Sequence, residues 1–157
     1  MIDAGDADRL VVVQLVDLPV QRHLRMRHHL TDMLRELTLI DLGERSEGDS
    51  DVPARLLRFV ADVRLRFADA NVLFQRQLRE AVSEGRQTVT LELALPPSAG
   101  QWARAFADYF DEADEFCRSG ELLTMASPPD VVAHRHWLAD EVERQLAAVT
   151  SPSAASS

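Results

Sequence analysis

The chain has 157 residues, 46% of them hydrophobic and 27% charged, which fits one globular domain whose core needs no metal ion or disulfide. Its formal net charge of −9 argues against non-specific binding to nucleic acid or to an anionic membrane, because both need a net basic face. A single cysteine, the absence of any apolar run near the ~20 residues of a membrane span, and a beginning unlike a signal peptide lead us to expect a cytoplasmic protein.

The first half of the chain predicts a strand followed by helices. Residues 1–8 are small and acidic, and we expect them to be disordered. The β-branched run Leu10–Val16 predicts a strand, which a Leu-Pro step ends. From Val20 to about Leu42 the apolar residues change to helical spacing. The stripe consists of Met26, Leu30, Met33, Leu37 and Ile40.

A polar loop over 43–50 precedes a second helical stretch, residues 53–84, which contains no internal Gly or Pro after its first turn. This stretch is either one long helix or two helices. We expect a break near Asp69–Asn71, because Asn71 is a good helix cap and a poor interior residue. Gly85 is expected to end the stretch.

The second half repeats the opening order. Strict alternation from Gln87 to Leu95 predicts a strand with one buried face, and a Pro-Pro step ends it. Ser98 is expected to cap the following helix, and Ser127–Asp130 to start a last helix. Residues 150–157 form a Ser/Ala tail that we expect to be disordered, so one helical domain would span 9–149. The fold we predict is mainly α (α+β): a bundle of four to five helices with a small two-stranded β element.

Histidines are the first candidates for chemistry. His28 and Asp32 are one turn apart on the first helix, so the carboxylate could orient the imidazole. A metal site would need ligands from the last helix, where a spacing of two points the histidines to different faces. A phosphoryl-accepting histidine is a second interpretation, and an ordinary polar helix face is the one that we favour. The other histidines considered are His23, His29, His134 and His136.

Cysteine and acidic residues near the end of the fourth predicted helix are the next candidates. Cys117 lies near a helix C-terminus among carboxylates, and both raise a thiol pKa, so we expect a core cysteine and not a nucleophile. The neighbouring carboxylates spread around the helix, so we expect a solvated face in preference to an acid/base or metal site. This acidic series is Asp108, Asp111, Glu112, Asp114 and Glu115.

The two charged segments differ in sign. The first helix carries Arg22, Arg25, Arg27 and Arg35 with little acid, whereas 108–115 is acidic. The two segments could meet inside one molecule, across a homodimer, or with a partner. No phosphate loop, nucleophile elbow or paired-cysteine motif is present, so we expect neither an enzyme nor a cofactor or metal site. The residues that we expect to bind a partner protein are Arg22, Arg25, His28 and Arg35.

Several blocks carry a family resemblance. The segment 111–124 (DEADEFCRSGELLT) and the segment 128–132 (PPDVV), with Leu18-Pro19, His28-His29 and Leu34–Leu37 before them, resemble small regulatory proteins of GC-rich bacteria. The lack of any lysine is typical of such genomes. The resemblance covers most of 9–147 and implies a role in the partner-switching systems that regulate sigma factors, with an anti-sigma or antagonist component as the partner. It assigns no catalytic residue, and the ATP-binding boxes of anti-sigma kinases are missing.

The function that we expect is therefore that of a non-enzymatic regulatory or adaptor protein that acts in signalling by binding another protein. One alternative is a histidine phosphotransfer-like helical bundle that uses His28 or His29. Another is a small-molecule sensor domain in which Trp102, Phe106 and Trp137 line a cavity.

Overall fold

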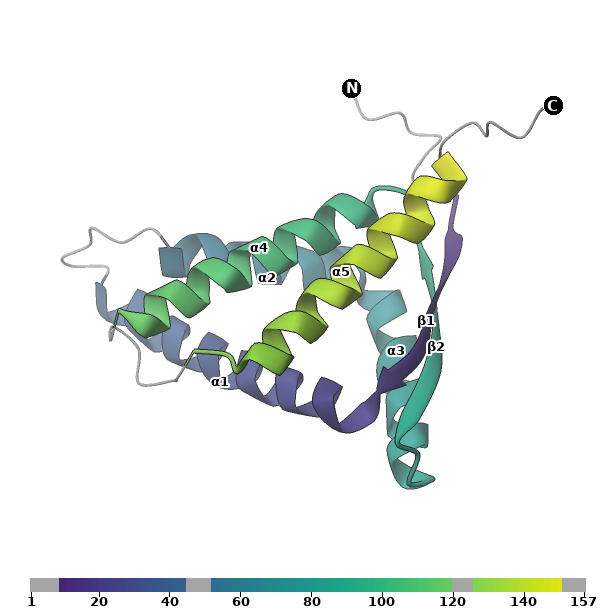
Figure 1. Cartoon of the computed structure of the whole chain (residues 1–157). Coiled ribbons are helices and arrows are strands. Elements are labelled where there is room, and N and C mark those ends of the chain that lie inside the picture. Colours follow the sequence, from purple (N-terminus) through teal and green to yellow (C-terminus); the bar gives the residue numbers. More distant parts are fainter. Residues whose placement is uncertain (1–8, 45–51, 120–125, 151–157) are drawn as a thin grey trace.

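The computed structural model describes residues 9–44, 52–119 and 126–150, and this part of the chain forms five helices and a two-stranded sheet (Figure 1). The predicted mainly α fold with a small β element is thus confirmed. Of the segments expected to be disordered, 1–8 and 150–157, residues 1–8 and 151–157 lie outside the described residues, whereas Thr150 is the last residue of the final helix and so corrects the predicted start of the tail. Among the described residues, no helix is long and apolar enough to cross a bilayer. The elements are β1 (Val11–Pro19), α1 (Val20–Glu44), α2 (Val52–Arg66), α3 (Ala68–Ser83), β2 (Thr88–Leu95), α4 (Ala99–Arg118) and α5 (Pro129–Thr150).

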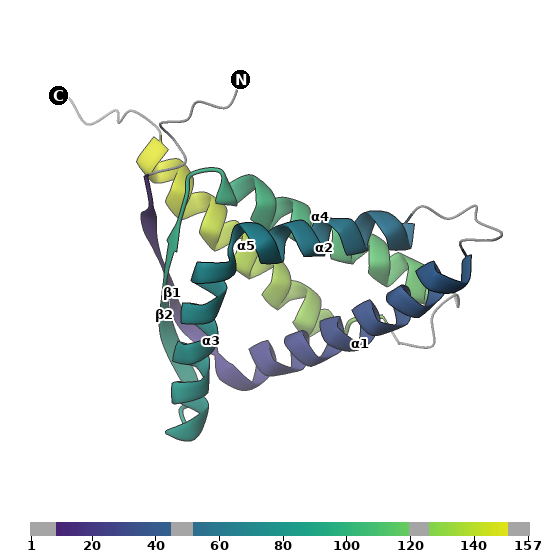
Figure 2. The same ribbon diagram turned by 180° about the vertical axis from the view of Figure 1, so that it is seen from behind.

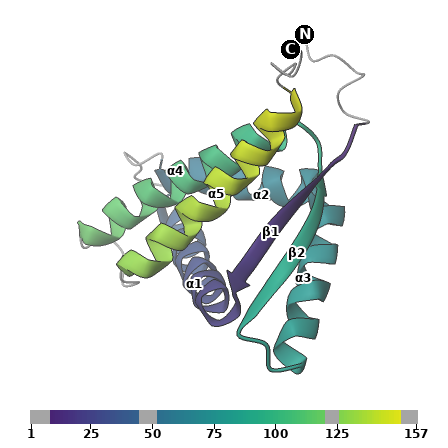
Figure 3. The same ribbon diagram turned by 45° about the vertical axis from the view of Figure 1, so that its right-hand side comes forward.

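The two strands pair antiparallel, as the repeated strand-then-helix order suggested, and each is accompanied by a helix from the other half of the chain (Figure 3). Helix α3 packs along β2 and α5 along β1. The buried face pairs Leu15 with Leu91 and Leu18 with Val89. β1 runs three residues beyond the predicted end, because the register shifts between Leu15 and Leu18 while Asp17 adopts a left-handed φ of 54°. This bulge absorbs one residue, so that Leu18, and not Asp17, points into the core.

Two glutamine side chains close the outer edges of this ribbon. The Gln77 amide of α3 donates to the Glu92 carbonyl at 3.0 Å and accepts from the Glu92 N–H at 3.1 Å. The Gln145 amide of α5 donates to the Gln14 carbonyl at 2.7 Å and accepts from the Gln14 N–H at 2.9 Å. Gln14 and Glu92 are direct cross-strand partners. Each amide therefore takes the place of a neighbouring strand's peptide group and protects an exposed edge.

The predicted break in 53–84 is present, but it falls at Phe67, which has φ −113° and ψ 29°. The Phe67 ring meets the Trp102 ring edge-on at 6.0 Å, so packing against α4 holds the break two residues before the expected place. Asn71 lies inside the first turn of α3 and its side chain accepts a hydrogen bond from Gln75 at 3.4 Å. Gly85 ends α3 with a φ of 68°, as predicted. The expected cap at Ser98 is wrong: Ser98 holds the N-cap position, but its side chain makes no capping hydrogen bond.

The core consists of two apolar clusters that lie side by side. One joins the ribbon to α3 and to the end of α5, around Leu15, Leu78 and Leu91. The other joins α1, α2 and α4, around Met33 and Leu56. Charged and polar groups lie at the borders of the two clusters, and the candidate sites are found there.

Candidate functional site

The four residues predicted to bind a partner lie on α1, and their side chains are exposed. The side chains of Arg22, Arg25 and His28 are 48%, 59% and 81% exposed, and Arg35 is exposed as well. The Arg25 guanidinium lies 2.5 Å from the Asp130 carboxylate at the start of α5, and Arg22 lies 3.9 Å from it. One carboxylate therefore faces two guanidinium groups, and this part of α1 keeps a net positive charge.

A groove of about 350 Å³ borders these cations between α1 and the start of α5. Leu24, Pro128 and Val131 give it apolar walls, and Arg25 and His28 lie at its rim. The predicted one-turn pair is present, because the His28 Nε2 lies 3.4 Å from an Asp32 oxygen. This groove joins apolar surface to positive charge.

His23 does not belong to the same surface as His28. It is 4% exposed and its Nδ1 lies 3.1 Å from Nε2 of His134, which is equally buried. Burial, then His134, then Arg27 lower the pKa of His23 to about 3, and burial followed by Arg22 lowers the pKa of His134 to about 4. Both rings are therefore neutral at pH 7, so one donates and the other accepts. The sequence could have predicted that His23 is buried, because His23 lies three residues before Met26 and so extends the apolar stripe of Met26 and Leu30.

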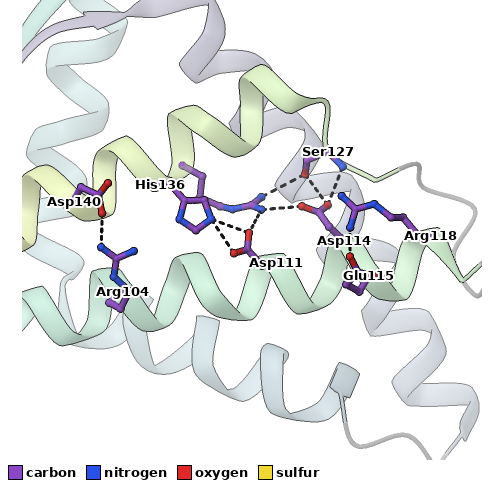
Figure 4. Close-up of polar contacts among 9 residues, drawn as sticks. Arg104, Asp111, Asp114, Glu115, Arg118, Ser127, His136 and Asp140 are labelled. Carbon is purple, nitrogen blue, oxygen red and sulfur yellow. Dashed lines mark hydrogen bonds and ion pairs between the residues drawn. The ribbon is translucent and has the colours of Figure 1, made fainter.

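The acidic segment of α4 is only partly solvated, which corrects the expectation of a solvated face. Figure 4 shows its contacts with Ser127 and His136. Asp114 is 1% exposed, and so is Arg135, which sequence analysis missed. The Arg135 Nη2 donates to Asp111 at 2.7 Å and to Asp114 at 2.8 Å. The second oxygen of Asp114 accepts from the N–H and the hydroxyl of Ser127, each at 2.8 Å. Ser127 thus binds α4, and α5 begins at Pro129, within the segment Ser127–Asp130 that was predicted to start it.

These residues form a layer between α4 and α5 that we call the α4–α5 seam. It consists of Asp111, Asp114, Ser127, Arg135 and His136. His136 Nε2 lies 3.0 and 2.8 Å from the two oxygens of Asp111. Next to the seam, Arg104 bridges Asp140 and Glu143, and Arg55 of α2 binds Glu112 at 3.2 Å. Among the described residues the acidic segment and the α1 arginines therefore do not pair with each other. Each finds its partners mainly on other helices.

The seam contains serine, histidine and aspartate side chains, which are residue types that also occur in active sites. The Ser127 hydroxyl donates to a carboxylate that already binds a guanidinium, which uses the hydroxyl structurally. In the part of the chain that the structure describes, no three His, Cys, Asp or Glu side chains are placed to hold a metal ion. Cys117 is buried, and burial, then Asp114 and Glu36, raise the pKa of its thiol to about 11. It is a core cysteine, as predicted.

The three aromatic residues predicted to line one cavity do not share one. Trp102 stacks on Phe59 with ring centroids 5.6 Å apart, and Trp137 stacks on His134 at 5.7 Å. Phe106 alone of the three borders the cavity that lies between α1, α2 and α3. Sequence reasoning found the aromatic residues but could not assign them to partners, because helical spacing does not specify which helix a stripe meets.

Comparisons with known proteins add no further constraint to this geometry. No known protein family, curated protein or solved structure matches the chain. The interpretation therefore depends on the basic face of α1, the α4–α5 seam and the cavity.

Proposed function

We propose that this chain is a non-enzymatic regulatory or adaptor protein that binds an acidic segment of another protein through α1. We call Arg22, Arg25, His28 and Arg35 the basic face. The observation that carries the proposal is that these side chains are exposed in a chain of net charge −9, and that Arg22 and Arg25 share one carboxylate, Asp130. An acidic partner would be attracted to this face and repelled by most of the remaining surface, which fixes its orientation.

The groove beside the basic face supports a partner that is amphipathic. Its walls at Leu24, Pro128 and Val131 would accept apolar side chains, while acidic side chains on the same segment reach Arg25 and His28. In the free protein Asp130 binds Arg25, and Asp32 lies beside His28. A partner carboxylate would compete with an exposed ion pair that contributes little stability, so this competition costs little.

The resemblance seen in the sequence makes an anti-sigma or antagonist component of a partner-switching system the first partner to test. Such a role places the protein in the bacterial cytoplasm. A homodimer is the other arrangement in which a basic face could meet an acidic segment of a second copy.

The experiment compares two variants with equal loss of charge. In the first, Arg22, Arg25 and Arg35 become Ala. In the matched control, exposed arginines elsewhere become Ala, namely Arg58, Arg76 and Arg79. Tagged wild-type and variant proteins are used to capture partners from cells of the native host, and bound proteins are quantified by mass spectrometry.

We expect the first variant to lose the wild-type partner at least tenfold and the control to retain it. Binding should weaken as salt is raised from 50 to 300 mM, because exposed charges are screened over ~10 Å at 0.1 M salt. Retention of every wild-type partner by the first variant would rule out the basic face as the binding surface.

A histidine phosphotransfer function is the second candidate, favoured by the 81% exposure of the His28 side chain beside Asp32. His29 is less suited, because its Nε2 is buried and has no hydrogen-bond partner among the described residues. After incubation with a cognate histidine kinase, this function predicts an acid-labile phosphate that His28→Ala abolishes and His29→Ala leaves. Absence of such a phosphate on the wild-type chain would remove this candidate.

A further inference from the structure

A cavity of about 390 Å³ opens between α1, α2 and α3, the helices that frame the front of the view in Figure 2, and reaches β2 and α4. It lies where the two core clusters meet. Met26, Leu30 and Phe110 come from the helical cluster, and Phe74 and Leu95 from the cluster around the ribbon. A space of this size falls within the range of small-molecule sites. We call it the α1–α3 cavity.

The cavity has an apolar floor and a polar mouth. Its floor consists of buried side chains such as Met26 and Phe110, whereas Arg27 and Arg64 are exposed at the mouth. Asn71 is exposed there as well. Although the chain contains 26 Asp and Glu residues, none of the described residues that line the cavity is acidic. The mouth is therefore cationic in a protein whose overall charge is negative.

Neither guanidinium at the mouth has an ion-pair partner among the described residues. By contrast, the buried Arg135 is matched by two carboxylates. Burial beside the cavity already lowers the pKa of Arg27, so part of its hydration is lost without compensation. His23, one turn before Arg27, lines the cavity as a neutral ring. An anionic group placed at the mouth would meet two cations and no competing carboxylate.

We propose that the α1–α3 cavity binds an apolar monocarboxylate, such as a medium-chain fatty acid. The hydrocarbon body lies on the floor, and the carboxylate lies at the mouth between Arg27 and Arg64. Apolar burial supplies the affinity, and the two guanidinium groups select the anion over an alcohol or an amine of the same length. This site goes beyond the proposed protein binding, because the basic face of α1 does not line the cavity.

The test uses three probes that differ only at the head group: decanoate, decanol and decylammonium. Each is titrated into the full chain below its micelle concentration by isothermal titration calorimetry. We expect decanoate to bind at least tenfold more tightly than decanol, and decylammonium to bind most weakly. No binding of decanoate, or equal affinity for decanoate and decanol, would overturn the proposal.

Two sets of variants locate the site. Arg27→Gln with Arg64→Gln should weaken decanoate at least tenfold and bring it to the affinity of decanol, while Arg76→Gln with Arg79→Gln on the outside of α3 leaves it unchanged. Ala70→Leu places three extra carbons in the cavity and should abolish binding of both probes. Circular dichroism checks that each variant is folded. If Ala70→Leu does not fold, methyl NMR of the wild type with decanoate decides: shifts are expected at Leu30 and Leu34, and shifts confined to residues outside the cavity would overturn the proposal.

Discussion

Arginines meet opposite surroundings in two regions of this molecule, one of them buried and the other exposed at the mouth of a cavity. In the α4–α5 seam, Arg135 is 1% exposed and binds Asp111 and Asp114. At the α1–α3 cavity, Arg27 and Arg64 border an apolar space whose described lining contains no carboxylate. Among the described residues, carboxylates pair with the arginine of the seam, and none pairs with the two arginines at the cavity. Arg135 is thus part of the packed structure, whereas Arg27 and Arg64 are the groups that we propose to bind the carboxylate of a ligand.

The seam can be broken most severely by removing one charge of its buried pair. Asp114→Ala leaves Arg135 buried with Asp111 as its remaining carboxylate, and we expect it to lower the free energy of unfolding by about 3–5 kcal/mol. Urea denaturation monitored by circular dichroism measures this. Glu115→Ala, one residue away on the exposed side, should change stability by less than about 1 kcal/mol.

A double variant sharpens this prediction. Asp114→Leu with Arg135→Met removes both buried charges, and it should recover part of the stability that Asp114→Ala loses. If the double variant is less stable than Asp114→Ala, the buried ion pair stabilises the fold more than the apolar pair that replaces it.

Acid should weaken the contact between the two regions, where His23 of α1 meets His134 of α5. The pKa values of about 3 and about 4 lie below the ordinary 6.5, so the unfolded chain takes up protons at a pH where the folded chain does not. The two neutral histidines therefore contribute fully to the free energy of unfolding above pH 6.5, and this contribution is lost as the pH falls towards 4. The loss at pH 5 is about 2 kcal/mol for each histidine.

Urea denaturation at several pH values tests this linkage. His23→Gln with His134→Gln should flatten the dependence of stability on pH between 5 and 7. His28→Gln is the control, because His28 is exposed, and its curve should keep the wild-type slope. Equal slopes for the double variant and the wild type would contradict the prediction.

A larger side chain should destabilise the protein more where the core is packed than where it borders the α1–α3 cavity. Ala113→Leu introduces a larger side chain on α4, where Ala113 is 0% exposed, and should destabilise by about 1–3 kcal/mol. Ala70→Leu at the cavity should change stability by less than about 1 kcal/mol, because the added carbons enter existing space. Thermal unfolding compares the two, and equal destabilisation would mean that the cavity is not available.

The last prediction concerns the reactivity of Cys117, which lies beside the seam, and not the stability of the fold. Because burial raises the pKa of its thiol to about 11, the folded protein should react with a disulfide reagent at pH 8 at least a hundredfold more slowly than the chain in urea. The release of a chromophore reports the rate. Rapid reaction in the folded state would show that the end of α4 opens readily.

Helical and strand spacing identified every element among the described residues, and it also placed Cys117 in the core. Boundaries were less certain. The break in 53–84 is set by Phe67 against Trp102, and the end of β1 by a bulge at Asp17. Neither depends on local propensity, because both follow from contacts with residues distant in the sequence.

The polar sites also show which features depend on local spacing and which depend on contacts between distant residues. By itself the sequence determined the amphipathic stripes and the strand alternation, because these depend on periodicities of 3.6 and 2 residues along one element, and it showed that arginines gather on α1. Only the tertiary structure decided that Asp114 is buried against Arg135, that His23 meets His134, and that Arg27 and Arg64 border a cavity whose described lining contains no acidic residue. A charge on an apolar stripe can be stable only where another helix supplies its partner, and no pattern along a single helix records which helix that is.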